Sequence, residues 1–145
     1  MAGQIPLDTK YYPSDFHVTN VTVTPGTTEQ FIPILYFDRL SVVDSIVAYF
    51  GDAPSADETL RFCKVTSDAL PTDAGISAQT NITAAKALAA AGTFPARWIS
   101  GTTSGFTIQT ANNLMEAGST LWLVGASALA GINGFQIQVR WRSQV

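Results

Sequence analysis

The feature that most constrains the fold is a strict alternation of residue types near the end of the chain. Residues 135–143 read FQIQVRWRS, in which phenylalanine, isoleucine, valine and tryptophan alternate with glutamine and arginine. Successive side chains of a β-strand point to opposite faces of a sheet, so a period of two predicts a strand with one buried face and one solvated face. Such a half-buried antiparallel strand needs a second layer over its apolar side.

A neighbouring stretch, TLWLV at residues 120–124, does not alternate. Four large apolar residues follow the threonine with no polar side chain between them. Continuous apolar runs of this kind are typical of strands that are covered on both faces. We therefore expect one face of this strand to meet the core, and the other to meet a loop or a second subunit.

The chain from residue 16 onward carries strand signals separated by turns at intervals of about ten residues. Residues 41–50 and 59–66 flank the turn-rich loop GDAPSADE and are predicted to form a hairpin. Pro33 cannot donate a ladder hydrogen bond, so its strand is predicted at an edge or at a bulge. The pattern predicts an all-β fold, an antiparallel β-sandwich or jelly roll of about eight strands, in one domain spanning residues 16–145.

Two segments depart from this pattern. Residues 1–15 show neither helical nor strand periodicity and contain two prolines beside Tyr11 and Tyr12, which predicts an extended N-terminal arm. Residues 81–91, NITAAKALAAA, are rich in alanine and precede Gly92. This composition slightly favours one short helix over a strand there.

The composition indicates which kinds of molecule the chain can bind. Charged residues make up 13% of the chain and hydrophobic residues 46%, and the charged share is about half the usual one. We therefore expect a surface of uncharged polar residues, partly covered by partner subunits. The net charge of −3 without clustered lysine or arginine argues against nucleic-acid binding. No apolar run approaches the length of a membrane span, and no signal-peptide pattern is visible.

Reactive residue types are too few for a familiar catalytic or metal site. The chain has one histidine, His17, and one cysteine, Cys63, whereas zinc sites need three or four such ligands. Both residues are predicted to be structural, and Arg140 and Arg142 to lie on a solvated strand face. The acidic residues of the loops lack an EF-hand spacing and are common turn formers. We expect no enzymatic activity, no cofactor and no metal.

Four stretches between residues 42 and 142 carry a resemblance to a known family. They are SIVAYFGDAPSADETLRFCKV, TSDALPTDAG, NNLMEAGSTLWLV and FQIQVRWRS. In this order they resemble the small decoration, or cement, proteins of tailed-bacteriophage capsids. The resemblance implies a non-catalytic homotrimer at three-fold or quasi-three-fold positions, bound to the major capsid protein. It also implies a place on the exterior of the virion after assembly in the host cytoplasm, with the arm contacting the shell.

Aromatic residues outside the predicted core are the expected contacts, because they cover much area with few torsions to order. The expected interface residues are Tyr11, Tyr12, Pro13, Phe16, Trp98 and Trp122. Two alternatives remain open at this point. The arm could fold back over its own domain, and Trp98 could be a core residue or a sugar platform. The alternative function is a β-sandwich carbohydrate- or receptor-binding module of the head-fibre or tail-tip type.

Overall fold

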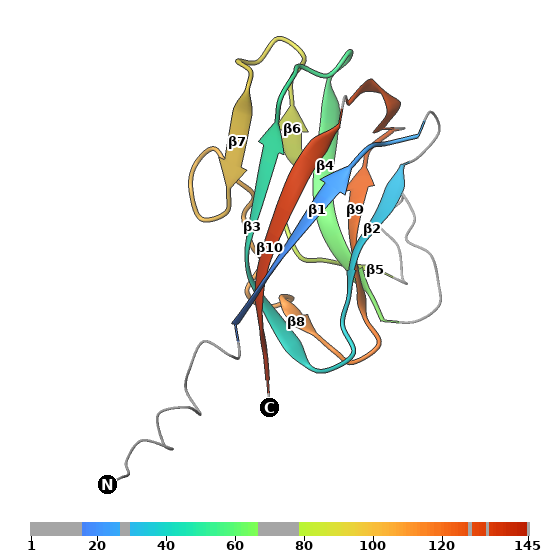
Figure 1. The fold of residues 1–145 in the computed structure, drawn as a ribbon, viewed down its shortest axis with the longest axis vertical. Helices are drawn as coiled ribbons and strands as arrows, with labels where there is room; N and C mark the ends of the chain where they lie inside the picture. Colours follow the sequence, from blue (N-terminus) through green and yellow to red (C-terminus); the bar gives the residue numbers. More distant parts are fainter. Residues whose placement is uncertain (1–15, 27–29, 67–78, 128, 133, 145) are drawn as a thin grey trace, which may run out of the picture.

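The computed structural model describes residues 16–26, 30–66, 79–127, 129–132 and 134–144. These residues contain ten strands in two antiparallel sheets that pack face to face (Figure 1). Sheet A consists of β1 (Phe16–Val23), β10 (Phe135–Ser143), β3 (Ser41–Phe50), β7 (Ala96–Ile99) and β8 (Leu114–Met115). Sheet B consists of β2 (Phe31–Tyr36), β9 (Thr120–Gly125), β4 (Glu58–Val65), β5 (Gln79–Asn81) and β6 (Lys86–Leu88). One 3-10 turn spans Leu129–Gly131.

The strand order is that of a jelly roll. Sheet A runs β1-β10-β3-β7 and sheet B runs β2-β9-β4-β5, with β8 beside β3 and β6 beside β4. The pairs are therefore nested: β1 with β10, β2 with β9, β3 with β7 and β4 with β5. A ribbon rolled up in this way is the jelly-roll arrangement of two packed Greek keys. The predicted all-β sandwich is confirmed, and β6 and β8 are short additions to eight main strands.

A chain of five aromatic rings runs through the core and joins the sheets. Phe135 of β10 stacks on Phe50 of β3, with ring centroids 5.0 Å apart. Phe50 meets Trp98 of β7 at 4.9 Å, and Trp98 meets Phe106 at 5.2 Å. Phe106 in turn contacts Phe62 of β4, in sheet B, at 5.0 Å. Edge-to-face and offset contacts of this kind add to the stabilisation from burial alone.

The alternating strand behaves as predicted. Ile137 and Val139 of β10 are almost fully buried, whereas Gln136, Arg140 and Arg142 are exposed. Pro33 also lies where its chemistry predicts. It is in β2, the edge strand of sheet B, and the pairing of β2 with β9 shifts register immediately after it.

The non-alternating strand β9 is covered on both faces over much of its length. Leu121 and Leu123 point into the core and are 0% exposed, while Trp122 on the opposite face is half-buried. On that outer face of sheet B, Val124 and Cys63 are also 0% exposed, although neither belongs to the core cluster. The expectation of two covered faces holds for Val124 and in part for Trp122.

The predicted hairpin of residues 41–50 and 59–66 is wrong. β3 pairs with β10, β7 and β8 in sheet A, whereas β4 pairs with β9, β5 and β6 in sheet B. The loop between them therefore crosses from one sheet to the other. Each strand points its apolar side chains into the core from its own sheet. The sequence of two such strands alternates in the same way as that of a hairpin, so the alternation does not distinguish the two arrangements. The stacked sheets thus replace side-by-side pairing.

The helix favoured at residues 81–91 is also wrong. Cys63 pairs with Asn81, and Leu60 with Lys86, so this segment supplies β5 and β6 to sheet B. Ile82, between these pairings, and Leu88, which pairs with Glu58, are buried in the core. Pairing with β4 outweighs the helix propensity of the alanines, because propensity is weak beside tertiary packing.

Replacing Phe106 tests the aromatic chain at its link between the sheets. Phe106→Ala is expected to lower the free energy of unfolding by about 3–5 kcal/mol, because it removes a buried ring that neighbouring residues can refill only in part. Urea denaturation followed by tryptophan fluorescence measures the loss. The matched control is Tyr49→Ala, since Tyr49 is 41% exposed. Equal effects of the two substitutions would contradict the account.

Candidate interaction surface

The outer face of sheet A carries exposed apolar and basic side chains side by side. The strand register places side chains from β1, β10, β3 and β7 on this face. Its exposed members include Phe16, Val18, Tyr49, Arg97, Arg140 and Arg142. Phe16 and Tyr49 are each 41% exposed and Val18 is 56% exposed. These large apolar side chains lie beside the three arginines and the uncharged polar residues Asn20, Thr22 and Gln136.

Two arginines organise one end of this face. The Arg140 guanidinium lies 5.0 Å from the ring centroid of Phe16, in a cation–π contact. Arg142 Nε donates a hydrogen bond of 3.1 Å to Asp44 Oδ1. The arginine side chains are therefore held flat along the sheet. The result is a partly apolar, positively charged patch around Phe16.

Strand β1 forms the edge of sheet A among the described residues, and its own sequence and pairing carry none of the features that usually protect an edge strand. Its eight residues, FHVTNVTV, contain no lysine, acidic residue or proline, and its pairing with β10 runs without a register shift. The edge strand of sheet B differs, since Pro33 and a register shift interrupt it. A long, regular edge strand offers unpaired N–H and C=O groups to another strand. β1 is therefore suited to contact with a second chain.

His17 of β1 takes a structural role. Its ring stacks on Trp141, with centroids 4.1 Å apart and planes inclined by 18°. The Trp141 indole N–H donates a hydrogen bond of 3.2 Å to Thr19 Oγ1. His17 therefore packs on the inner side of β1, against Trp141 of β10.

The structure describes three of the six expected interface residues, namely Phe16, Trp98 and Trp122. Tyr11, Tyr12 and Pro13 lie outside the described residues. Phe16 is exposed on the outer face of sheet A. Trp122 is half-buried on the outer face of sheet B, opposite Cys63.

Trp98 is a core residue rather than a surface contact. Only 8% of it is exposed, and its ring lies between Phe50 and Phe106. This is the core alternative left open by the sequence. The burial of Trp98 argues against a sugar platform at this residue, because the ring belongs to the core and Lys86 Nζ lies 5.0 Å from its centroid.

The acidic loop residues considered as metal ligands hold the backbone instead. Glu58 is 8% exposed, and its Oε1 accepts hydrogen bonds from the backbone N–H groups of Ala126 and Ser127, at 3.1 and 3.2 Å. Asp57 Oδ1 accepts one from the Ala90 N–H at 2.8 Å. Within the described residues, no group of three or more histidine, cysteine, aspartate or glutamate side chains could hold a metal ion.

No family model matches the chain, and no curated protein matches it. The described part of the chain has no helix long and apolar enough to cross a membrane.

Cys63 is expected to be unreactive in the folded protein. Burial raises the pKa of its thiol to about 11, against a smaller opposing effect of Arg61, and the thiolate is the reactive form. A maleimide reagent at neutral pH should leave the native chain unlabelled and label it fully in denaturant. Rapid labelling of the native chain would show that the outer face of sheet B opens.

The Lys64–Glu116 pair gives a second prediction, because it lies at one end of the sandwich with one buried partner. Lys64 Nζ contacts Glu116 Oε2 at 3.0 Å and also donates to the Leu114 carbonyl; its side chain is 9% exposed, against 49% for Glu116. Burial raises the pKa of Glu116. Hydrogen bonds from its own backbone N–H and from Lys64, with the charge of Lys64, outweigh burial and hold that pKa below 4.5.

A carboxyl with a lowered pKa stabilises the fold above its ordinary value of 4.5, and loses that contribution as the pH falls through the folded pKa. Glu116→Gln should therefore cost about 0.5–1 kcal/mol at pH 7 and almost nothing at about pH 3. Urea denaturation at both pH values measures this difference. The control is Asp38→Asn, which removes the partner of Arg39 in a pair exposed on both sides. An equal cost of Glu116→Gln at both pH values would refute the assignment.

Proposed function

We propose that the chain is a structural virion protein that decorates a bacteriophage capsid as a homotrimer. The observation that carries the proposal is the outer face of sheet A together with the unprotected edge of β1. Exposed Phe16 and Val18 beside Arg140 give this face an apolar and basic character, which suits contact with another protein surface.

The jelly-roll order supports the proposal at the level of fold. Jelly rolls serve as capsid subunits and also as lectin domains, so the fold agrees with the proposed role without specifying it. The symmetry of a shell repeats one weak contact many times, and the repeated contacts together stabilise the assembly. The proposed partners are two further copies of this chain and the major capsid protein of the same virus, on the exterior of the virion.

The low charge of the chain supports the same proposal. Only 13% of the residues are charged, and the exposed positions of β1 carry no charged side chain, while those of β10 carry Arg140 and Arg142 beside Gln136. A surface with few charges has little solvation to lose when another subunit covers it. The alternative of a glycan-binding module built on Trp98 is not supported, because that ring is buried.

Solution mass and capsid binding test the proposal together. Light scattering behind a sizing column should give a mass about three times the 15.4 kDa of one chain. Co-sedimentation should then show the chain bound to expanded heads that lack it. Val18→Lys adds a charge to the centre of the proposed contact and should weaken assembly or capsid binding at least tenfold, because an unpaired charge is costly to bury.

The matched control is Ala87→Lys, which places the same charge at an exposed strand position of sheet B. This variant should assemble and bind like the unaltered chain. A chain that stays monomeric at micromolar concentration and does not sediment with heads would refute the proposal.

A further inference from the structure

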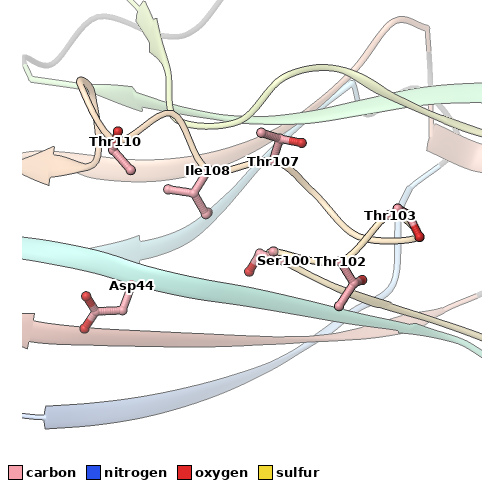
Figure 2. A pocket seen from close by; sticks show the side chains of 8 residues that line it. Asp44, Ser100, Thr102, Thr103, Thr107, Ile108 and Thr110 are labelled. Atoms are coloured by element: carbon pink, nitrogen blue, oxygen red, sulfur yellow. The ribbon is translucent and has the colours of Figure 1, made fainter.

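A groove beside β3 is lined mainly by hydroxyl-bearing side chains and one carboxylate. β7 pairs only with residues 47–50 of β3, so the first half of β3 has no strand at that side except β8 at its start. The chain after β7 turns outward there and encloses a groove of about 550 Å3. Ligand sites in proteins have volumes of roughly 300–1,000 Å3. The lining residues are Asp44, Ser100, Gly101, Thr102, Thr103, Thr107, Ile108 and Thr110 (Figure 2).

Both walls of this groove are fixed by hydrogen bonds, so its shape is formed in advance. Ser100 Oγ accepts from the Ile46 N–H at 2.6 Å and donates to the Ile46 carbonyl at 2.8 Å, which ties one wall to β3. The other wall is tied to sheet B, because Gln109 N–H donates to the Ile82 carbonyl at 2.7 Å. Gly105 closes the turn between the walls: an added Cβ there would lie 1.6 Å from the Ile99 carbonyl oxygen.

Asp44 lines the groove at an irregularity in β3. Arg140 pairs with Ser45 and Trp141 pairs with Val43, so Asp44 is the extra residue of a β-bulge. Bulges redirect a side chain and recur beside functional sites. The side chain of Asp44 is 26% exposed. Figure 2 shows Asp44 on β3 and Ile108 and Thr110 on the neighbouring segment that lines the same groove.

The Asp44 carboxylate retains unused hydrogen-bonding capacity. A carboxylate offers about four acceptor positions, and the described residues fill one of them, through Arg142 Nε and Oδ1. Oδ2 is enclosed and has no partner. The terminal torsion of aspartate is broad, so the carboxylate can turn about the Cβ–Cγ bond when a ligand donor replaces the hydrogen bond from Arg142.

Three hydroxyls on the rim are also available. Thr103, Thr107 and Thr110 are exposed, and their hydroxyls make no hydrogen bond to the residues that the structure describes. By contrast, the Thr102 hydroxyl donates to the Ile99 carbonyl at 2.7 Å. Each threonine hydroxyl can both donate and accept. Ile108 adds an apolar patch between them.

We infer that this groove binds a neutral polyol, namely a saccharide unit, through the Asp44 carboxylate and the hydroxyls of Thr103, Thr107 and Thr110. Arg142 already balances the charge of Asp44, so the carboxylate needs a hydrogen-bond donor rather than a cation. A sugar supplies hydroxyl donors to Asp44, matches the donor and acceptor capacity of the threonines, and places C–H groups on Ile108. Three or four such hydrogen bonds give a dissociation constant on the order of 1 mM.

Titration of the isotope-labelled chain tests the inference without reference to capsids. The probes are D-glucose, D-galactose and N-acetyl-D-glucosamine, each followed by amide chemical shifts in two-dimensional NMR. At least one sugar should produce saturable shifts centred on Asp44 and Thr107. The double variant Thr107→Val, Thr110→Val removes two hydroxyls at nearly constant volume and should weaken binding about tenfold or more.

The matched control is Thr22→Val on the exposed outer face of β1, which should bind like the unaltered chain. Asp44→Asn provides an independent variant and should also weaken binding, since it halves the carboxylate's acceptors. The spectrum of each variant without sugar shows whether it is folded. The inference is overturned if no sugar gives saturable shifts, if the double variant binds as well as the unaltered chain, or if ethylammonium binds more tightly than every sugar.

Discussion

The packing of Phe106 against Trp98 and Phe62 is the contact on which the rest of the structure depends. Trp98 belongs to sheet A and Phe62 to sheet B, and Phe106, outside both sheets, touches both rings. It extends an aromatic chain that begins at Phe135 and passes through Phe50. The chain ties the two faces of the jelly roll together on the side where β7 and β6 are short. It also fixes the segment that follows β7, and with it the walls of the groove beside Asp44.

The outer faces of the two sheets differ in the exposure of their apolar side chains. The outer face of sheet B carries Val124 and Cys63, which are fully buried. The outer face of sheet A carries Phe16 and Val18, which are exposed beside Arg140. Sheet A also ends in an edge strand without charge, proline or bulge. These contrasts direct the proposal of subunit and capsid contacts to sheet A.

The periodicity of the sequence predicted those features of the fold that depend on neighbouring residues alone. The alternation of residues 135–143 identified β10, and the missing N–H of Pro33 identified an interrupted edge strand. The hairpin failed because alternation reports which face of a strand is buried but not which sheet the strand joins. The helix at residues 81–91 failed because pairing with β4 outweighs the propensity of alanine. The bulge at Asp44 has no local signature, since it arises from the register between β3 and β10.

Amide hydrogen exchange of β1 at increasing protein concentration tests the central claim most directly. If the edge of β1 and the outer face of sheet A meet another copy of the chain, exchange of residues 16–23 should slow as the concentration rises and slow further on capsids. The buried strand β9 serves as an internal reference whose exchange stays slow throughout. Exchange of β1 that is fast and independent of both concentration and capsids would contradict the account.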